Sequence, residues 1–345
     1  MDQMIVSPDG QWIAVVANDA NNAGALYLAS VTNAATPTVV SPAGAVYASH
    51  PRFSMDSKNL YFLASVVAGG TVGKMLYTVT LSSPGTTTPV SAPNSASSDE
   101  VLDYSFAPDQ SSIALQANRL GVVGLYYVNP TMLQTEWPVS GTLTAGQSII
   151  DSTVGRNYGS GSATRVGYTV RSTVSLSYGV FVANVSTSPA PALISTSPGS
   201  MSTIGFRPDN GALLYIQNAQ VQESVIGAGT QTVGVGANAW YDSTGNIVLL
   251  EQFLSTTPYP SLAVTARGQF GTSQPLGTPG LAAQYFSVSG FDRAVVLLGE
   301  GSPGPKPASA QLALVNAMAG DKPLYLANFQ SPLTLTSDPA TIVTY

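Results

Sequence analysis

Residues 4–19, MIVSPDGQWIAVVAND, place a Ser-Pro-Asp-Gly turn between two short apolar runs. Pro8 presets the backbone for the first corner of a type I turn, and Gly10 tolerates a positive φ. Asp9 can accept hydrogen bonds from nearby backbone N–H groups. The segment therefore predicts a tight β-hairpin, and the fold depends on whether this hairpin recurs along the chain.

The same segment recurs six times. Counting the first, the seven copies begin near residues 3, 50, 103, 151, 203, 237 and 285, and the copy near 151 is the weakest match. Each copy leads into a second apolar strand, and most continue into a third strand and a short fourth strand rich in Pro and Thr. Proline fits an outermost strand because an edge strand can spare one ladder N–H. Four strands per repeat are typical of a propeller blade.

We therefore predict an all-β fold, a seven-bladed β-propeller of four-stranded antiparallel blades, with residues 1–330 forming one propeller domain. Residues 331–345 form a C-terminal tail, whose stretch 340–344 is predicted to pair with a terminal blade and close the ring, since closure removes exposed edges. The acidic turn residues are predicted to cap the hairpins and to carry no chemistry. They are Asp9, Asp56, Asp109 and Asp209.

These repeats resemble the WD40-like PD40 family, which includes the TolB-like propellers and the propeller domains of prolyl oligopeptidase-type enzymes. The clearest matches are Ser7-Pro8-Asp9-Gly10, Ala107-Pro108-Asp109 and Arg207-Pro208-Asp209-Asn210. The resemblance covers nearly the whole chain and implies the propeller fold. TolB-like proteins carry an α/β domain before the propeller, and the peptidases carry a hydrolase domain with a G-x-S-x-G elbow. Neither feature is found in this sequence, so the roles of those proteins are not carried over.

The charge composition argues against two classes of partner. The chain of 345 residues holds 12 Lys and Arg against 18 Asp and Glu, a net charge of −6, with no basic cluster. Nucleic acid is therefore not an expected partner, because binding its phosphates requires a basic surface. The longest apolar runs, such as AVVLL at 294–298, are far shorter than the roughly 20 residues of a membrane-spanning helix. We expect no membrane span and a monomer.

Few residues are available for catalysis. The chain has no cysteine and one histidine, His50, so a Ser-His-Asp site would depend on His50 and a zinc site would have one imidazole and no thiolate. The glycine-rich segments 159–167 and 227–236 match neither a dinucleotide-binding fingerprint nor a P-loop. We predict no catalytic residue, no metal and no cofactor, and favour a protein that is not an enzyme.

Candidate binding residues come from matched positions in the repeats. The innermost strands carry Gln3, His50, Asp103, Asp151, Thr203, Ala237 and Tyr285 at equivalent places. Because side chains alternate along a strand, these positions face the same way in every blade, and an inward face would bring them together near the mouth of the channel. The predicted binding residues are Gln3, His50, Asp103, Asp151 and Tyr285. They could bind a cation, a water network or a partner's basic side chain, or merely hydrogen-bond water and neighbouring backbone.

The predicted function is a non-catalytic binding or scaffold propeller that contacts a protein partner in the bacterial cell envelope. Binding is expected on the long, dissimilar connections at 17–24, 64–74, 251–260 and 299–309, since variable loops on a rigid scaffold commonly bind ligands. The start MDQMIV lacks the features of a leader peptide, so we expect a periplasmic or cell-surface protein whose leader has been removed. Two alternatives stay open: a lyase or glycan hydrolase acting at the channel mouth, and a structural module of a larger surface protein.

Overall fold

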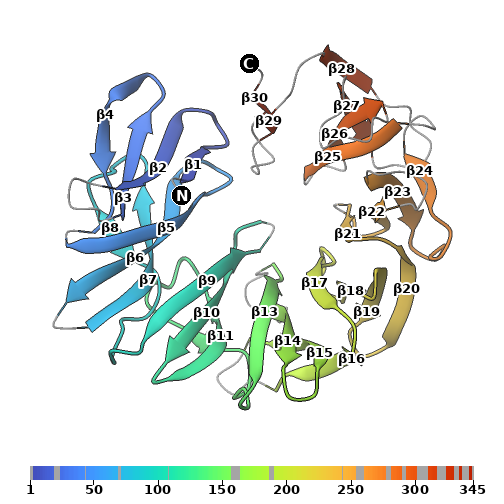
Figure 1. Cartoon of the computed structure of the whole chain (residues 1–345), viewed down its shortest axis with the longest axis horizontal. Helices are drawn as coiled ribbons and strands as arrows, with labels where there is room; N and C mark the ends of the chain where they lie inside the picture. The colour runs from blue at the N-terminus through green and yellow to red at the C-terminus, as the bar shows by residue number, and fades with distance from the viewer. Residues whose placement is uncertain are drawn as a thin grey trace. The chain divides into compact units, whose positions relative to one another are not determined.

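The computed structural model describes residues 3–18, 24–42, 44–68, 71–107, 109–156, 164–185, 190–242, 244–253, 260–276, 281–289, 293–300, 310–316, 324–329, 334–335 and 342–343. The chain divides into two compact units. The first comprises Met1–Val166 and Ala183–Ala192, and the second comprises Gly167–Val182 and Leu193–Tyr345. Every regular element of the described residues is a strand (Figure 1). The prediction of an all-β fold is confirmed.

The first unit begins with three four-stranded antiparallel sheets, each built from strands consecutive in sequence. The first sheet is β1 (Gln3–Val6), β2 (Trp12–Asn18), β3 (Gly24–Ser30) and β4 (Asn33–Val39). The second is β5 (Ala45–Phe53), β6 (Asn59–Ala68), β7 (Thr71–Thr80) and β8 (Thr87–Pro89). The third is β9 (Glu100–Phe106), β10 (Ile113–Arg119), β11 (Val122–Val128) and β12 (Trp137–Pro138). The division between the units falls within the next sheet, β13 (Gln147–Val154), β14 (Arg165–Ser172), β15 (Ser177–Asn184) and β16 (Ala192–Ser197).

The second unit continues the same pattern of consecutive antiparallel strands. One sheet is β17 (Met201–Phe206), β18 (Ala212–Gln217), β19 (Gln220–Val225) and β20 (Gly229–Val235). The next is β21 (Asn238–Tyr241), β22 (Ile247–Phe253), β23 (Pro260–Ala266) and β24 (Gln274–Leu276). The last is β25 (Leu281–Ser289), β26 (Arg293–Glu300), β27 (Ala310–Asn316) and β28 (Leu324–Phe329). The short strands β29 (Thr334–Leu335) and β30 (Ile342–Val343) pair with each other. The rest of the predicted ring-closing stretch 340–344 lies outside the described residues, so ring closure stays a prediction.

The acidic residues of the repeated turn cap their own hairpins, as the sequence predicts. In each turn the carboxylate accepts a hydrogen bond from the backbone N–H two residues later. These bonds join Gln11 N to Asp9 (3.0 Å), Lys58 N to Asp56 (3.1 Å), Ser111 N to Asp109 (3.1 Å) and Gly211 N to Asp209 (2.7 Å). The hydroxyl of Ser7 also donates to Asp9, at 2.5 Å, and these bonds hold the pKa of Asp9 below its ordinary value.

The turns of neighbouring sheets in the first unit are also joined to each other. The fourth residue of the second and third turns has a positive φ, 53° at Ser57 and 57° at Gln110, and its side chain reaches the turn of the preceding sheet. Ser57 Oγ accepts from Asp9 N at 3.0 Å, and Gln110 Oε1 accepts from Met55 N at 2.6 Å. Each sheet is therefore tied to the one before it at this end, which we call the turn end (residues 7–10, 54–57, 107 and 109–110).

The apolar core lies between the faces of consecutive sheets. In the first unit, one cluster joins β1–β4 to β5–β8 through residues such as Leu26 and Phe62, and a second joins β5–β8 to β9–β12 through Leu63, Leu76 and Val101. In the second unit, equivalent clusters form on both faces of the β17–β20 sheet. Sheets packed face to face fit propeller blades. The described residues include no helix able to cross a bilayer.

Candidate functional site

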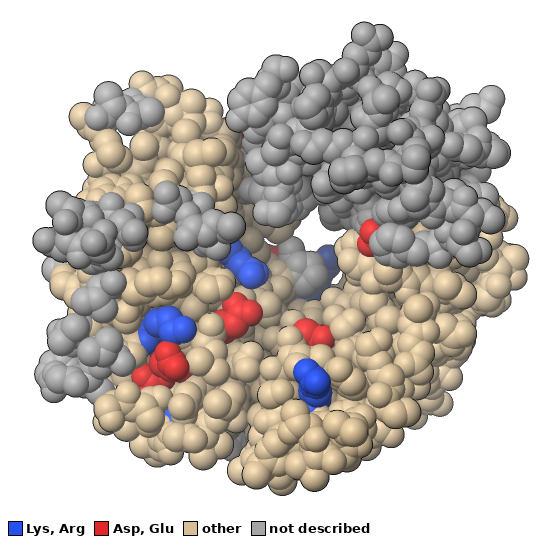
Figure 2. All heavy atoms as spheres, in the orientation of Figure 1, with Lys and Arg blue, Asp and Glu red and all other residues tan. Residues whose placement is uncertain are grey.

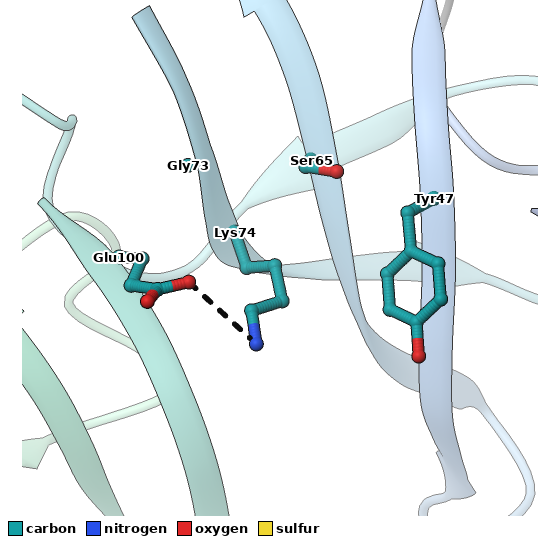
Figure 3. Close-up of a pocket in the computed structure, with 5 residues that line it drawn as sticks. All are labelled: Tyr47, Ser65, Gly73, Lys74 and Glu100. Carbon is teal, nitrogen blue, oxygen red and sulfur yellow. Dashed lines mark ion pairs between the residues drawn. The ribbon is translucent and has the colours of Figure 1, made fainter. Parts of the chain in front are cut away.

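The candidate site is a pocket of about 310 Å³ in the first unit (Figure 3). It lies at the end of the sheets opposite the turn end. We call this the loop end (residues 45–47, 65–66, 73–74, 99–100 and 120–122). The lining residues are Tyr47 of β5, Ser65 of β6, Gly73 and Lys74 of β7, and Glu100 of β9. Two neighbouring sheets therefore contribute to one pocket.

The strand register of the second sheet explains why a pocket forms at this place. Tyr47 pairs with Ser65 across β5 and β6, and Ser65 pairs with Lys74 across β6 and β7. Directly paired residues point to the same face of a sheet, so the three side chains form one row. Two strand spacings separate Tyr47 from Lys74, about 10 Å. The small side chain of Ser65 between them leaves the floor of the pocket open.

The same face of the sheet is apolar one layer deeper. Leu63 pairs with Leu76, two residues before Ser65 and two residues after Lys74, and both leucines are fully buried against Val101 of β9. Alternation along the strands keeps these positions on one face. The packed interface between the sheets therefore ends in a polar layer, and the pocket occupies that layer.

Gly73 allows the connection between β8 and β9 to lie against β7. A Cβ at this position would overlap the carbonyl oxygen of Asp99 and would lie 2.5 Å from Asn94 Nδ2. The same connection places Glu100 at the start of β9, facing Lys74 (Figure 3). The absence of a side chain at Gly73 is therefore a requirement for the geometry of the site.

Asp99 anchors this connection. Its carboxylate is 1% exposed and accepts hydrogen bonds from Leu120 N (2.6 Å), Ser95 N (2.9 Å), Ser95 Oγ (2.9 Å) and Ala96 N (3.2 Å). Burial desolvates the carboxylate and alone would raise its pKa, but the hydrogen bonds outweigh burial and the pKa of Asp99 lies below its ordinary value. The ionised side chain thus fixes both its own connection and the β10–β11 turn.

A buried ion pair holds the other side of the connection. Arg119 donates to both carboxylate oxygens of Glu136, at 2.6 and 3.0 Å, and donates to Asn94 Oδ1 at 3.2 Å. Glu136 in turn accepts from Ala92 N at 3.0 Å. Bidentate Arg–carboxylate contacts fix the orientation of both side chains and also contribute stabilising energy. The loop end is therefore held in place before any ligand binds.

Lys74 and Glu100 form an open ion pair. The Lys74 ammonium lies 3.6 Å from a Glu100 carboxylate oxygen, with the side chains 28% and 38% exposed. Figure 3 shows Lys74 between Glu100 on one side and Tyr47 on the other. At 3.6 Å the contact is longer than a hydrogen bond. Each charged group therefore faces the other and retains capacity to bind a third group.

The predicted binding residues lie elsewhere on the innermost strands, and none of them lines this pocket. The side chains of Gln3 in β1 and Tyr285 in β25 fall outside the described part of the structure. His50 lies in β5 with its ring Nδ1 3.0 Å from Ser49 Oγ, and Asp103 in β9 accepts from Tyr104 N at 2.8 Å. Asp151 lies in β13 and is partly exposed. Their role as binding residues stays a prediction.

The innermost strands of the first unit do lie beside one another in sequence order. The Tyr104 hydroxyl donates to the His50 carbonyl at 2.6 Å and so joins β9 to β5. Ser105 Oγ lies 3.4 Å from Ser152 Oγ and so joins β9 to β13. Within the described residues, no three His, Cys, Asp or Glu side chains gather in a group that could hold a metal ion.

Strict alternation fails at the predicted ring positions, however. The register shifts between Ser49 and Arg52 in β5, where His50 has φ 52°, and again beside Asp103, Thr203 and Tyr285. A β-bulge re-aims the side chains next to it. The matched positions therefore do not share a face merely because they share a sequence position.

The pocket residues Lys74 and Glu100 were not among the predicted binding residues. The sequence did carry one signal, because the variable segment 64–74 contains Ser65, Gly73 and Lys74. Most of that segment forms the ends of β6 and β7 rather than a long loop. Glu100 lies outside it, and only the packing of the next sheet brings it close. Figure 2 shows Lys and Arg interspersed with Asp and Glu on the viewed face, with no basic patch among the residues that are not grey.

No protein-family model and no curated protein matches the chain. Among solved structures, it is similar to dipeptidyl peptidase 4 from Porphyromonas gingivalis, with 12% identity, a TM-score of 0.57, and coverage of 93% of this chain and 51% of that chain. A puromycin-hydrolyzing peptidase from Mycobacterium tuberculosis gives 12% identity, a TM-score of 0.51, and coverage of 91% and 51%. The β-propeller domain of the Trilobed protease from Pyrococcus furiosus gives 12% identity, a TM-score of 0.46, and coverage of 96% of this chain and 99% of that chain.

At this identity the likeness to the two peptidases concerns the fold alone. Together with the repeated four-stranded sheets, it supports a β-propeller fold. The chain spans about half the length of both peptidases. The activity of those peptidases belongs to proteins about twice as long as this chain. The chemistry of the pocket therefore follows from its own residues.

Proposed function

We propose that this protein is a non-catalytic binding module, a seven-bladed β-propeller domain whose loop end receives a protein partner. The observation that carries this proposal is a rigid, partly apolar surface beside the pocket. At the β10–β11 turn, Leu120 is 73% exposed and Val122 is 46% exposed. An apolar patch with a polar rim is a common form of interaction site, and Leu120 and Val122 lie on the same short turn.

The turn that carries these side chains is pre-organised. Leu120 has a positive φ of 52°, a conformation that costs energy in a non-glycine residue, and its N–H donates to the buried carboxylate of Asp99 at 2.6 Å. A surface already held in its bound shape loses less conformational entropy on association. The exposed pair is therefore suited to docking a partner.

The second unit repeats this feature at the equivalent turn between the second and third strands of a sheet. There the β14–β15 turn carries Val174 and Leu176, both strongly exposed. Two occurrences at the same place in the repeat favour a role for these turns in binding. The bacterial cell envelope stays the predicted setting, and a monomer stays the predicted state.

Site-specific cross-linking tests the proposal. A photo-reactive amino acid at Val122, in cells of the source organism, is expected to cross-link to one defined protein. The substitution Leu120→Ser should abolish that product. Met55, an apolar residue at the turn end that is 61% exposed, is the matched control position and should give no such product. Equal cross-linking at Met55, or no protein product at Val122, would count against the proposal.

A second candidate is favoured by the half-length likeness to two peptidases. In that case the chain is the propeller part of a larger enzyme, and the loop end contacts the enzyme's own catalytic domain. Sequencing the complete gene separates the two candidates. A hydrolase domain in the same reading frame would support the second, and an isolated propeller would support the first.

A further inference from the structure

The pocket beside Tyr47 holds polar groups that the protein itself leaves available. Among the described residues, Lys74 Nζ and the Glu100 carboxylate contact each other at 3.6 Å and make no hydrogen bond to a third residue. An ammonium has three donors, and an ionised carboxylate has about four acceptor positions. The pocket therefore presents donors and acceptors side by side, both directed at the same space.

The charges of this pair restrict the ligand. Lys74 and Glu100 carry charges of opposite sign and lie close together, so the pocket has no net charge. An anionic ligand drawn to Lys74 would also meet the Glu100 carboxylate, and a cationic ligand drawn to Glu100 would meet the Lys74 ammonium. A hydroxyl group is donor and acceptor at once. It can accept from Lys74 and donate to Glu100 without separating the ion pair.

Tyr47 supplies the apolar wall. Its side chain is 48% exposed and lies on the other side of Lys74 from Glu100 (Figure 3). An aromatic ring provides a large, rigid apolar surface with a polar tip. Ser65, directly paired with Tyr47 and Lys74, has a side chain too small to fill the space between them. A flat ligand could thus lie against the tyrosine ring with its polar edge towards the ion pair.

We propose that this pocket binds one neutral saccharide ring. The C–H face of the sugar packs on the Tyr47 ring, and its hydroxyl groups bridge Lys74 and Glu100. A volume of about 310 Å³ is at the lower end for ligand pockets, which suits a single ring. This inference goes beyond the proposed protein partner and does not rest on it, since it uses Tyr47, Lys74 and Glu100 rather than the β10–β11 turn.

Saturation-transfer NMR and calorimetry test the proposal with defined probes. The neutral probes are the methyl glycosides of glucose, galactose, mannose and N-acetylglucosamine. Their charged counterparts are glucuronate and glucosamine, and glycine is the zwitterionic comparison. At least one neutral glycoside is expected to bind with a dissociation constant on the order of 1 mM, and both charged sugars and glycine about tenfold more weakly or not at all.

Three variants locate the binding. Tyr47→Ala and Glu100→Gln are expected to weaken binding of the neutral glycoside by about tenfold or more, while Tyr47→Phe, which keeps the ring, stays within about threefold of the wild type. Asp56→Asn is the matched control, because its exposed carboxylate also lies near a lysine, 3.5 Å from Lys58, but at the turn end, and it should bind normally. Melting curves verify that each variant is folded.

The proposal is overturned if no neutral glycoside binds at about 20 mM, if a charged sugar or glycine binds as tightly as the neutral sugars, or if Tyr47→Ala binds normally. The protein-partner proposal is tested by a different variant. If Leu120→Ser loses the cross-link and still binds sugar normally, the two surfaces act independently.

Discussion

Replacing Asp99 with alanine removes the carboxylate that joins the β8–β9 connection to the β10–β11 turn. The four hydrogen bonds that it accepts, from Ser95 N and Oγ, Ala96 N and Leu120 N, would be lost at a site that is 1% exposed. A hydrogen bond to a charged group contributes about 1.5–3 kcal/mol, but water entering the vacated space would restore part of this. We expect Asp99→Ala to lower the free energy of unfolding by about 3–5 kcal/mol.

The pH dependence gives the same test a second readout. Hydrogen bonds hold the native pKa of Asp99 below its ordinary value of 3.8 in spite of desolvation. The ionised carboxylate therefore contributes stability that is fully present above the ordinary pKa and is lost as pH falls through the lowered native pKa. The stability difference between wild type and Asp99→Asn should begin to shrink below about pH 5 and should continue to shrink as the pH falls through the lowered native pKa.

Urea unfolding followed by tryptophan fluorescence measures both effects. Asp103→Ala is the matched control, because within the described residues its exposed carboxylate accepts a bond only from the adjacent Tyr104 N–H, and it should cost less than about 1 kcal/mol. A loss below about 1 kcal/mol for Asp99→Ala, or a difference from Asp99→Asn that grows on acidification, would refute the assigned role of Asp99.

Three further substitutions test other parts of the structure. Ser57→Ala removes the acceptor of Asp9 N and should cost about 1 kcal/mol in urea unfolding, with no loss if the turns of neighbouring sheets are independent. Gly73→Ala should displace the β8–β9 connection and weaken binding in the pocket, and unchanged binding would show that the connection adapts. Glu223→Ala removes a fully buried carboxylate that accepts from Gln231 and the Tyr241 hydroxyl, both at 2.7 Å, and should lower the melting temperature through a loss of about 3–5 kcal/mol, whereas an unchanged melting temperature would contradict that account.

The repeated turn could be predicted because its interactions are local. Asp9 accepts from the N–H of Gln11, two residues away, so both partners lie within the five residues 7–11. The continuous apolar runs in strands such as β6 and β10 are equally local, and both faces of these strands are buried, which places Phe62 and Leu115 in the core. Strand identity and turn chemistry therefore follow from short stretches of sequence.

The pocket could not be predicted because it depends on pairings between distant residues. The registers of two strand pairs bring together Tyr47, Ser65 and Lys74. Glu100 belongs to the neighbouring sheet and lies near Lys74 only because the two sheets pack together. The predicted ring of inner-strand residues assumed uninterrupted alternation. The register shift around His50 breaks that assumption. Pro51 within it fits a bulge, but it does not say which way the neighbouring side chains point.

The row Tyr47–Ser65–Lys74 also bears on how such a site could arise or disappear. Ser65 lies one layer beyond the buried pair Leu63 and Leu76 on the same face. A leucine at this position would extend the apolar interface outward by one layer and fill the hollow, with the strands and turns unchanged. If the pocket binds the proposed sugar, one substitution at Ser65 would therefore be enough to remove the site and leave the scaffold intact.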